Sequence, residues 1–443
     1  MPSRILIKNG TIITFGKSCQ AIEDQALLIE GDRIAKIAPK AEIQGPFDRV
    51  LDAKGKVVLP GLINAHMHFY STFVRGLGKA APSASFQEVL ENLWWRLDKK
   101  LSLDDSYYSA KLMLVEAIRK GTTTLIDHHA SPGAVLGSLD AVAQAVKETG
   151  LRASLCYELS DRDGEKITQE GLEENAAFIR RCQKEKDPQL TALFGLHAAF
   201  TLSDKTMAEA AELGRSLDAG FHVHVAEASS DVGYNVKHYG KRVVERLESF
   251  GMLGPKTMAA HCVHVDQHEI EILARTGTMV AHNPQSNMNN AVGIADLIGL
   301  RSAGVLAGLG TDAMTVSMLE ETRVALWAQH LRANNPSCGF MEVAGALTAN
   351  NPEIASRVWG FPIGELKEGS AADVILVDYL PFTPLDNGTV LGHLIFGISE
   401  AVVDTTICGG RVLMEGRKLA IDLDEEEMVA RSRELAVKLW DRF

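Results

Sequence analysis

Eight short apolar runs, each followed by a longer stretch with helical spacing, most constrain what this 443-residue chain can fold into. Apolar runs of this length, bounded by turn residues, are typical of buried strands. Eight strand-then-helix units favour an α/β fold, and they fit a (β/α)8 barrel of the TIM type better than an open sheet. The predicted strands cover residues 57–68, 122–127, 152–157, 191–197, 220–225, 257–261, 278–282 and 305–310, and the clearest helices cover residues 106–119, 139–149, 204–217 and 242–250.

Both ends of the chain have a different pattern, rich in short β-type segments. Asn9-Gly10 and Gly31-Asp32 each lie between two apolar runs and predict β-hairpins. Further strands are predicted over residues 372–377, 402–407 and 411–414, and a closing helix over 425–440. We therefore expect a small β-sandwich built from residues 1–56 and 365–443, around a barrel of residues 57–364.

The composition of the chain argues against certain partners and indicates the cellular compartment. The net charge of -12 argues against binding to nucleic acid or to an anionic membrane surface, and no apolar run reaches the length of a membrane span. The first residues lack the apolar core of a signal peptide, and the six cysteines form no Cys-x-x-Cys pair, as expected for thiols in a reducing compartment. We expect a cytoplasmic protein with a small-molecule substrate, and a homo-oligomer, as is common for acidic barrel enzymes of this size.

Polar residues gather where a barrel places its chemistry, at the C-terminal ends of the strands. His66 and His68 are two residues apart on the first strand, so their side chains share a face and could grip one divalent metal if further ligands come from elsewhere. Taken alone, the pair is equally compatible with core or surface histidines. The accumulation at other strand ends favours the metal: His128, His129, His197, His224, His261, His282 and Asp312 all lie at or just after an apolar run.

The fifth strand carries His222 and His224 on one face, with Glu227 in the loop that follows. His224, at the rim, is the better ligand, whereas His222 lies deeper and is more simply a core histidine. Glu227 is either a solvated loop carboxylate or, beside an activated water, a proton shuttle. Asp312, at the end of the eighth strand, would join three imidazoles in a site that leaves a coordination position open.

A family resemblance rests on His66-x-His68, His224-x-x-Glu227, His261 and Gly310-Thr311-Asp312, inside β-rich flanks. This set resembles the amidohydrolase superfamily, in the branch that holds cytosine, guanine and S-adenosylhomocysteine deaminases and the triazine hydrolases. The similarity extends along the chain through residues 58–61, 121–124, 260–264, 281–284 and 369–373. Residues 92–98 and 127–132 further resemble the SsnA group of aminohydrolases, which is linked to selenium metabolism.

The resemblance implies one divalent metal, zinc first and iron as the alternative, held by His66, His68, His224 and Asp312. It implies that Asp312 takes a proton from the attacking water, that His261 orients this water, and that Glu227 protonates a ring nitrogen and then the leaving group. Other branches hold a second metal with a lysine from the fourth strand. Here His197 stands near the end of that strand, which favours the one-metal type.

Substrate contacts are also implied by the resemblance, for His197, Asn283, Ser286, Asn287 and one residue of the pair His128-His129, with His129 as our choice. Residues 155–158 lack the arginine that S-adenosylhomocysteine deaminases have there, which disfavours that substrate. Glu158, in the same stretch, is a loop residue, a substrate contact or a further metal ligand.

These observations predict hydrolytic removal of an amine from a nitrogen heterocycle of the purine, pyrimidine or pterin type. Two alternatives keep the same machinery with a different bond, chloride displacement or cyclic-amide hydrolysis. A third alternative is a scaffold that has lost catalysis, although such a chain is expected to lack some of the ligands.

Overall fold

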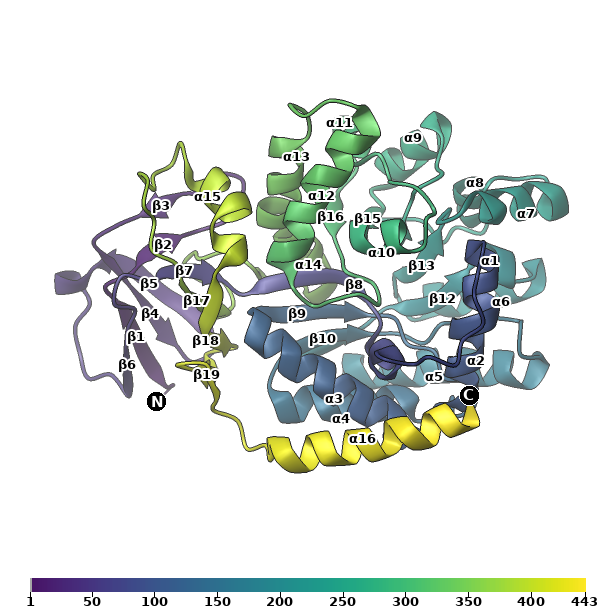
Figure 1. Ribbon diagram of the computed structural model, residues 1–443, viewed down its shortest axis with the longest axis horizontal. Coiled ribbons are helices and arrows are strands. Elements are labelled where there is room, and N and C mark those ends of the chain that lie inside the picture. Colours follow the sequence, from purple (N-terminus) through teal and green to yellow (C-terminus); the bar gives the residue numbers. More distant parts are fainter. Residues whose placement is uncertain (1) are drawn as a thin grey trace.

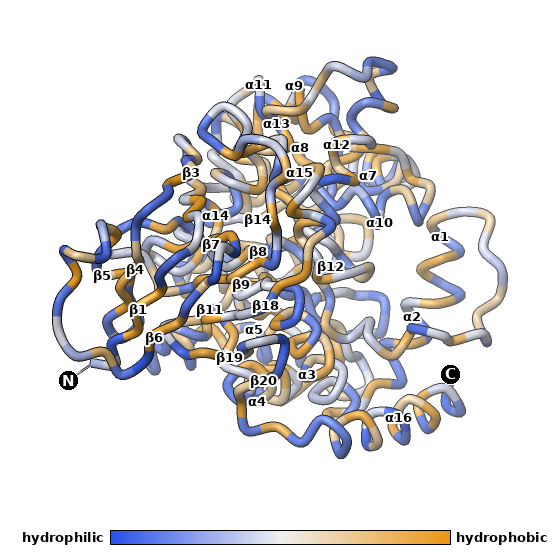
Figure 2. Tube along the Cα trace, turned by 60° about the vertical axis from the view of Figure 1, so that its left-hand side comes forward, coloured by the Kyte–Doolittle hydropathy of each residue, from blue (hydrophilic) through white to orange (hydrophobic). Residues whose placement is uncertain are grey.

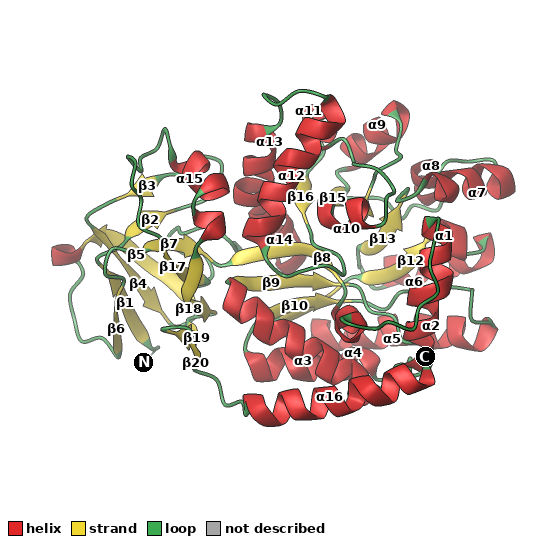
Figure 3. Ribbon diagram, viewed as in Figure 1, coloured by secondary structure: helices red, strands yellow, loops and turns green. Residues whose placement is uncertain are grey.

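A computed structural model describes residues 2–443 and places a β-rich region beside a larger region of alternating strands and helices (Figure 1). Strands occur in both regions, and helices surround those of the larger one (Figure 3). Among residues 2–443, the helices include none with the combined length and apolarity needed to span a membrane.

The β-rich region contains two sheets that mix strands from both ends of the chain. The first has the order β5 (Arg33–Pro39), β4 (Gln25–Glu30), β1 (Arg4–Lys8), β6 (Arg49–Asp52). The second has the order β20 (Lys418–Leu419), β19 (Arg411–Glu415), β18 (Val402–Cys408), β17 (Val374–Asp378), β7 (Val57–Pro60), β2 (Thr11–Ile13), β3 (Ala21–Ile22). One apolar cluster joins them, with Ile5, Leu27 and Ile29 from the first sheet and Val58 and Val374 from the second.

The hairpin predicted at Gly31-Asp32 is confirmed, since β4 and β5 pair antiparallel on either side of it. The hairpin predicted at Asn9-Gly10 is wrong. There β1 lies in one sheet beside β6 and β2 lies in the other beside β7, both in parallel pairs. The turn therefore carries the chain between sheets, and the segment from β6 to β7 makes the same crossing alongside it. A turn signal with apolar flanks does not say whether the flanks pair with each other or with a third strand.

Two parallel sheets form the centre of the larger region. One has the order β11 (Leu190–Ala192), β10 (Arg152–Leu155), β9 (Thr122–Asp127), β8 (Leu62–Met67). The other has the order β12 (Phe194–Ala198), β13 (Phe221–Val225), β14 (Met258–His261), β15 (Met279–His282), β16 (Ala307–Leu309). All eight predicted strands are present, but residues 57–68 divide at Gly61 into β7 and β8, and residues 191–197 divide at Leu193 between the two sheets.

Backbone and side-chain hydrogen bonds connect these two sheets at both of their edges. After β16, Thr311 N donates to His66 O of β8 at 2.9 Å. At the other edge, the amide of Asn175 binds the N–H and C=O groups of both Tyr157, just after β10, and Gly195, in β12.

Helices cover the parallel strands, and all of the helices predicted from the sequence are present. The long ones are α3 (Leu103–Lys120), α4 (Ser138–Thr149), α5 (Glu165–Glu185), α6 (Asp204–Ser216), α7 (Ser229–Tyr239), α9 (Gln267–Thr276), α12 (Met318–Ala333), α14 (Asn351–Trp359) and α16 (Glu425–Arg442). The short ones are α1 (Phe86–Val89), α2 (Trp95–Leu97), α8 (Val243–Ser249), α10 (Pro284–Asn289), α11 (Leu297–Ser302), α13 (Phe340–Gly345) and α15 (Val390–Phe396). In Figure 2, α16 alternates hydrophilic and hydrophobic colours along its length, as expected for a helix with one packed face.

Local sequence explains where such helices begin and end. Ser102 and Asp105 form reciprocal side-chain to backbone hydrogen bonds at the start of α3. Gly121 ends the helix with φ of 72°, a left-handed conformation that suits glycine. The next residue, Thr122, begins β9, so the end of α3 determines where this strand starts.

Candidate active site

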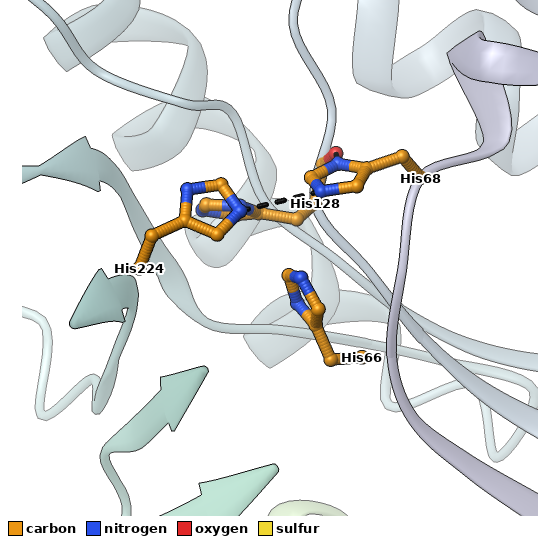
Figure 4. Close-up of side chains that lie close together, drawn as sticks. All are labelled: His66, His68, His128 and His224. Carbon is orange, nitrogen blue, oxygen red and sulfur yellow. Dashed lines mark hydrogen bonds between the residues drawn. The ribbon is translucent and has the colours of Figure 1, made fainter. Parts of the chain in front are cut away.

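The four predicted metal ligands come together at the C-terminal ends of the parallel strands. His66 belongs to β8 and His224 to β13, while His68 and Asp312 follow β8 and β16. The Nε2 atom of His68 lies 2.9 Å from Asp312 Oδ1 and 3.3 Å from His224 Nε2, and His66 Nε2 lies 3.8 Å from Asp312 Oδ1. Figure 4 shows the three ligand histidines converging, with His128 beside them.

Hydrogen bonds on the far side of each ring show that these histidines fit a divalent metal. The Nδ1 atoms of His68 and His224 lie 2.6 and 2.7 Å from backbone carbonyl oxygens. A carbonyl only accepts, so each Nδ1 carries a proton, and each Nε2 faces the common point, where it can bind a metal once it is unprotonated. His66 makes the equivalent bond to His222 Nε2 at 2.9 Å, and its own Nε2 has no hydrogen-bond partner among residues 2–443. Histidine ligands of zinc or iron are held in this way.

Backbone strain is concentrated around the same point. Asp312, His261 and Ala226, which precedes Glu227, have φ of 54°, 72° and 47°, in the left-handed region that non-glycine residues adopt at a cost. At Gly310 a Cβ atom would lie 2.7 Å from His66 N, so only glycine lets the chain after β16 approach β8 this closely. The fold thus tolerates unfavourable conformations in order to aim these side chains.

The three predicted catalytic side chains, Glu227, His261 and Asp312, lie close together. His261 Nε2 lies 3.6 Å from Glu227 Oε2 and 3.8 Å from Asp312 Oδ2. Asn290 Nδ2 donates to Glu227 Oε1 at 3.3 Å, and the Ser286 hydroxyl donates to Asp312 Oδ2. Ser286 and Asn290 were not predicted as carboxylate partners, because their contacts depend on how α10 folds over the strand ends.

Burial and neighbouring charges together shift the pKa values of the two carboxyl groups in opposite directions. Burial, and the nearby negative charge of Asp312, raise the pKa of Glu227 well above its ordinary value. At Asp312 burial acts in the same direction, but the adjacent His68 outweighs it and leaves the pKa of Asp312 below its ordinary value. Carboxyl groups whose pKa values are pushed apart in this way suit an acid and a base of one reaction.

A cavity opens beside the ligands, and an aromatic segment that was not predicted to take part forms one of its walls. Phe86 and Leu90 come from α1 and the start of η3 (Leu90–Trp94), and Trp94 and Trp95 from the end of η3 and the start of α2. The η3 turn is π-helical, and such turns are frequent at functional sites. Large apolar residues at positions 86, 90 and 94 have helical spacing and could have indicated a helix with one apolar face. Nothing in the sequence showed that this helix lies over the strand ends.

Of the predicted substrate contacts, His197 lines the cavity, and burial lowers its pKa to about 3. Asn287 and Asn283 are fully buried, and Asn287 Oδ1 accepts a hydrogen bond from His261 Nδ1 at 2.8 Å. His129 is also fully buried, with Nε2 3.0 Å from the Ser131 hydroxyl. These last three residues do not line the cavity. Their part in substrate binding stays a prediction.

The two residues left open by the sequence lie together behind His68. Glu158 lines the cavity, 3.2 Å from His68 Nδ1 and 3.5 Å from His128 Nδ1. Burial raises the pKa of Glu158, but the hydrogen bond and charge of His68 outweigh that effect and leave it at about 2. His128 is fully buried and its Nε2 donates to His222 O at 3.2 Å.

Comparison with known proteins agrees with this geometry. The model of the amidohydrolase family matches residues 57–413. The chain belongs to this family. It is therefore a hydrolase. Its candidate site, at the C-terminal ends of the parallel strands, lies where barrel enzymes have their active sites.

Two curated relatives and one solved structure describe its neighbourhood within the amidohydrolases. It is 33% identical to a 5'-deoxyadenosine deaminase of Methanobrevibacter smithii, over 94% of this chain and 93% of the relative. It is 34% identical to a 5-methylthioadenosine/S-adenosylhomocysteine deaminase of Carboxydothermus hydrogenoformans, over 98% of each. Its fold matches an adenosine deaminase of Xanthomonas campestris with bound zinc, with a TM-score of 0.85, 24% identity and 99% coverage of each chain.

Proposed function

We propose that this amidohydrolase removes ammonia from an aminated nitrogen heterocycle. The observation that carries the proposal is the convergence of His66, His68, His224 and Asp312 beside a buried carboxyl, Glu227, whose pKa is raised. The two curated relatives described above are both named as deaminases, which supports the same bond.

Each side chain would then have a defined part. His66, His68, His224 and Asp312 hold one divalent metal, zinc or iron, which when bound lowers the pKa of a coordinated water to about 7. Asp312 accepts a proton from the attacking water. His261 donates its Nδ1 proton to Asn287, so its Nε2 is free to accept a hydrogen bond from that water. Glu227 delivers protons to a ring nitrogen and to the departing amine.

Replacement of Glu227 tests this assignment. We expect Glu227→Gln to keep its metal, because Glu227 is not a ligand, and to lose turnover by about 10²–10⁴-fold. The measurements are metal analysis of protein purified without chelator and ammonia release over a panel of heterocyclic amines. Glu165→Gln, the same exchange at a side chain that is 84% exposed, is the matched control. Near-normal turnover of Glu227→Gln would show that the proton shuttle is misassigned.

We also propose that the two parallel sheets close into a (β/α)8 barrel over residues 57–364, with a β-sandwich formed by residues 1–56 and 365–443. The Thr311 to His66 hydrogen bond and the Asn175 contacts support closure at the two edges. The shared apolar cluster of Ile5, Leu27 and Val374 supports the sandwich.

Cytoplasmic location and a homo-oligomeric state are part of the same proposal, as is the lack of a nucleic-acid partner. The net charge of -12 supports the last point, since a phosphate backbone would be repelled. Light scattering of the purified chain during gel filtration tests the oligomeric state.

A further inference from the structure

We propose that the substrate ring carries an uncharged, apolar substituent, which packs on an aromatic wall near the metal ligands, and that rings with a phosphate or carboxylate substituent are excluded. The aromatic wall consists of Trp94, Trp95 and Phe200, which all line the cavity. This inference rests on the deamination proposed above and narrows its substrate class. It comes from the positions of these rings and from the charged side chains around the cavity.

One line of ring contacts leads from a metal ligand to the surface of the protein. His197 lies next to the ligand His224, with 5.5 Å between the ring centroids. The rings of Trp95 and Phe200 follow, with centroids 6.2 and 5.9 Å from that of His197. The ring of Tyr234 lies 6.1 Å from that of Phe200, and Tyr234 is 41% exposed, so this line reaches solvent. Aromatic groups in contact have separations of this size.

A second line of rings starts at another ligand, His68. The ring centroid of Tyr70 lies 5.3 Å from that of His68, and the centroid of Trp94 lies 6.3 Å from that of Tyr70. In both lines the aromatic wall therefore stands one ring beyond a residue that contacts a ligand. A heterocycle whose reacting carbon is held at the ligands would present an outward substituent to this wall.

The aromatic wall offers apolar surface to such a substituent. Trp94, Trp95 and Phe200 are only half-buried, although they line a cavity, and Met314 adds a further half-buried apolar side chain to the same cavity. An apolar group that covers these side chains removes their surface from water, which is favourable. Small-molecule sites are commonly lined in this way, with a few polar groups that fix the orientation of the ligand.

A buried cation, Arg162, contacts the aromatic wall from outside the cavity. Its guanidinium carbon lies 5.3 Å from the centre of the Trp95 ring, but Arg162 is not among the residues that line the cavity. The guanidinium is paired with Asp98, and its Nε lies 3.2 Å from Asp163 Oδ2. Arg162 is therefore already neutralised and supports Trp95 instead of serving an anionic ligand. Because Asp98 is paired as well, it does not require a cationic ligand.

The charged residues that do line the cavity cannot pair with an anion. Within residues 2–443 they are all acidic, namely Asp98, Glu158, Glu227, Asp231 and Asp312. A phosphate or carboxylate on the substituent would lose its water and would meet neither a lysine nor an arginine at the wall. Leaving a charge unpaired in a buried place is costly, whichever of the acidic groups are protonated. An uncharged apolar substituent has no such cost.

Matched derivatives that differ only in the substituent test the proposal. They are the 9-methyl, 9-benzyl, 9-carboxymethyl and 9-aminoethyl derivatives of guanine and of adenine. Calorimetry on zinc-loaded Glu227→Gln measures binding without turnover, and ammonia release by the wild type gives kcat/KM. We expect the benzyl member to bind about 10–100-fold more tightly than the methyl member, and the carboxymethyl member to bind at least about tenfold more weakly. Acetate is titrated separately, because a carboxylate alone can bind the metal.

Variants of the aromatic wall separate its rings from the general shape of the cavity. In Trp95→Ala we expect the preference for benzyl over methyl to fall to less than about threefold with unchanged metal content, whereas Trp95→Phe should retain it. Phe200→Lys places a cation at the wall, so the carboxymethyl member should then bind at least about tenfold more tightly than the methyl member. Phe382→Lys, the same exchange at a side chain that is 93% exposed and outside the cavity, is the matched control and should keep the wild-type order.

Three results would overturn the proposal: equal binding of the four members or failure of all of them to bind, tightest binding of the aminoethyl member, and an unchanged order in Trp95→Ala or Phe200→Lys. Preferential binding of the benzyl member with no ammonia from any compound would have a different meaning. It would overturn the proposed deamination and leave the assignment of the aromatic wall standing.

Discussion

The hydrogen bond between His66 and His222 joins a proposed metal ligand to a residue outside the proposed ligand set. His66 Nδ1 and His222 Nε2 are hydrogen-bonded at 2.9 Å, which fixes the orientation of the His66 ring. We expect His222→Phe, which keeps an aromatic ring but removes the hydrogen-bond partner of His66, to weaken metal binding by about 10–100-fold. Competition with a chromogenic chelator measures this, with His268→Phe, at a side chain that is 63% exposed, as control. Unchanged affinity would mean that His222 only fills space in the core.

At the residue scale, the convergence of the predicted metal ligands could be predicted from the sequence because strand geometry is regular. His66, His224 and Asp312 follow apolar runs at the same end of parallel strands, so their convergence was predictable without any knowledge of the loops. Glu158, Ser286 and Trp95 depend on the path of the chain after the strands, which no short-range pattern determines. Asn287 shows the same limit, because its contact with His261 depends on where α10 lies.

At the scale of the elements, Asn175 of α5 joins the end of β10 to β12, two strands that have no regular backbone pairing with each other. Its amide accepts from Tyr157 N and Gly195 N, each at 3.0 Å, and donates to the carbonyl oxygens of both residues. We expect Asn175→Leu to lower the free energy of unfolding by about 3 kcal/mol, because the buried N–H groups of Tyr157 and Gly195 lose their acceptor. Urea denaturation measures the loss, and Gln144→Leu on the exposed part of α4 is the control. A loss below about 1 kcal/mol would mean that the strands find other partners.

Element type and order were predictable, whereas pairing was predicted only in part. The strand predicted at residues 122–127 matches β9, and the predicted helices 139–149 and 204–217 match α4 and α6 to within one residue at each end. The hairpin predicted at Asn9-Gly10 was wrong because a local pattern indicates a turn but not the strand with which each flank pairs. Here β1 pairs with β6, and β2 pairs with β7.

At the scale of the whole molecule, the C-terminal helix α16 packs against residues that adjoin the wall of the active-site cavity. Trp440 Nε1 donates to Phe73 O at 2.8 Å, and Leu435 and Leu439 pack in a cluster with Leu97 and Tyr70. We expect Trp440→Ala to lower kcat/KM by about tenfold, mainly through KM, because the aromatic wall loses its support. Val437→Ala, on the same helix but 55% exposed, should behave like the wild type. Normal KM in Trp440→Ala would mean that α16 does not support the cavity.

The stability of the whole molecule should depend on pH through Glu321 of α12. This side chain is fully buried, accepts a hydrogen bond from Gln285 N at 3.0 Å, and has a pKa raised by burial from 4.5 to about 8. Since the folded-state pKa lies above the unfolded one, the stabilisation is complete below pH 4.5 and is lost as the pH rises toward about 8. Glu321→Gln removes this titration, so its stability relative to the wild type should increase by about 2 kcal/mol between pH 6 and pH 8. Urea unfolding at both pH values measures the difference, with the exposed Glu353→Gln as control. A constant difference would show that Glu321 is ionised throughout this range and that another group on α10 or α12 compensates its charge.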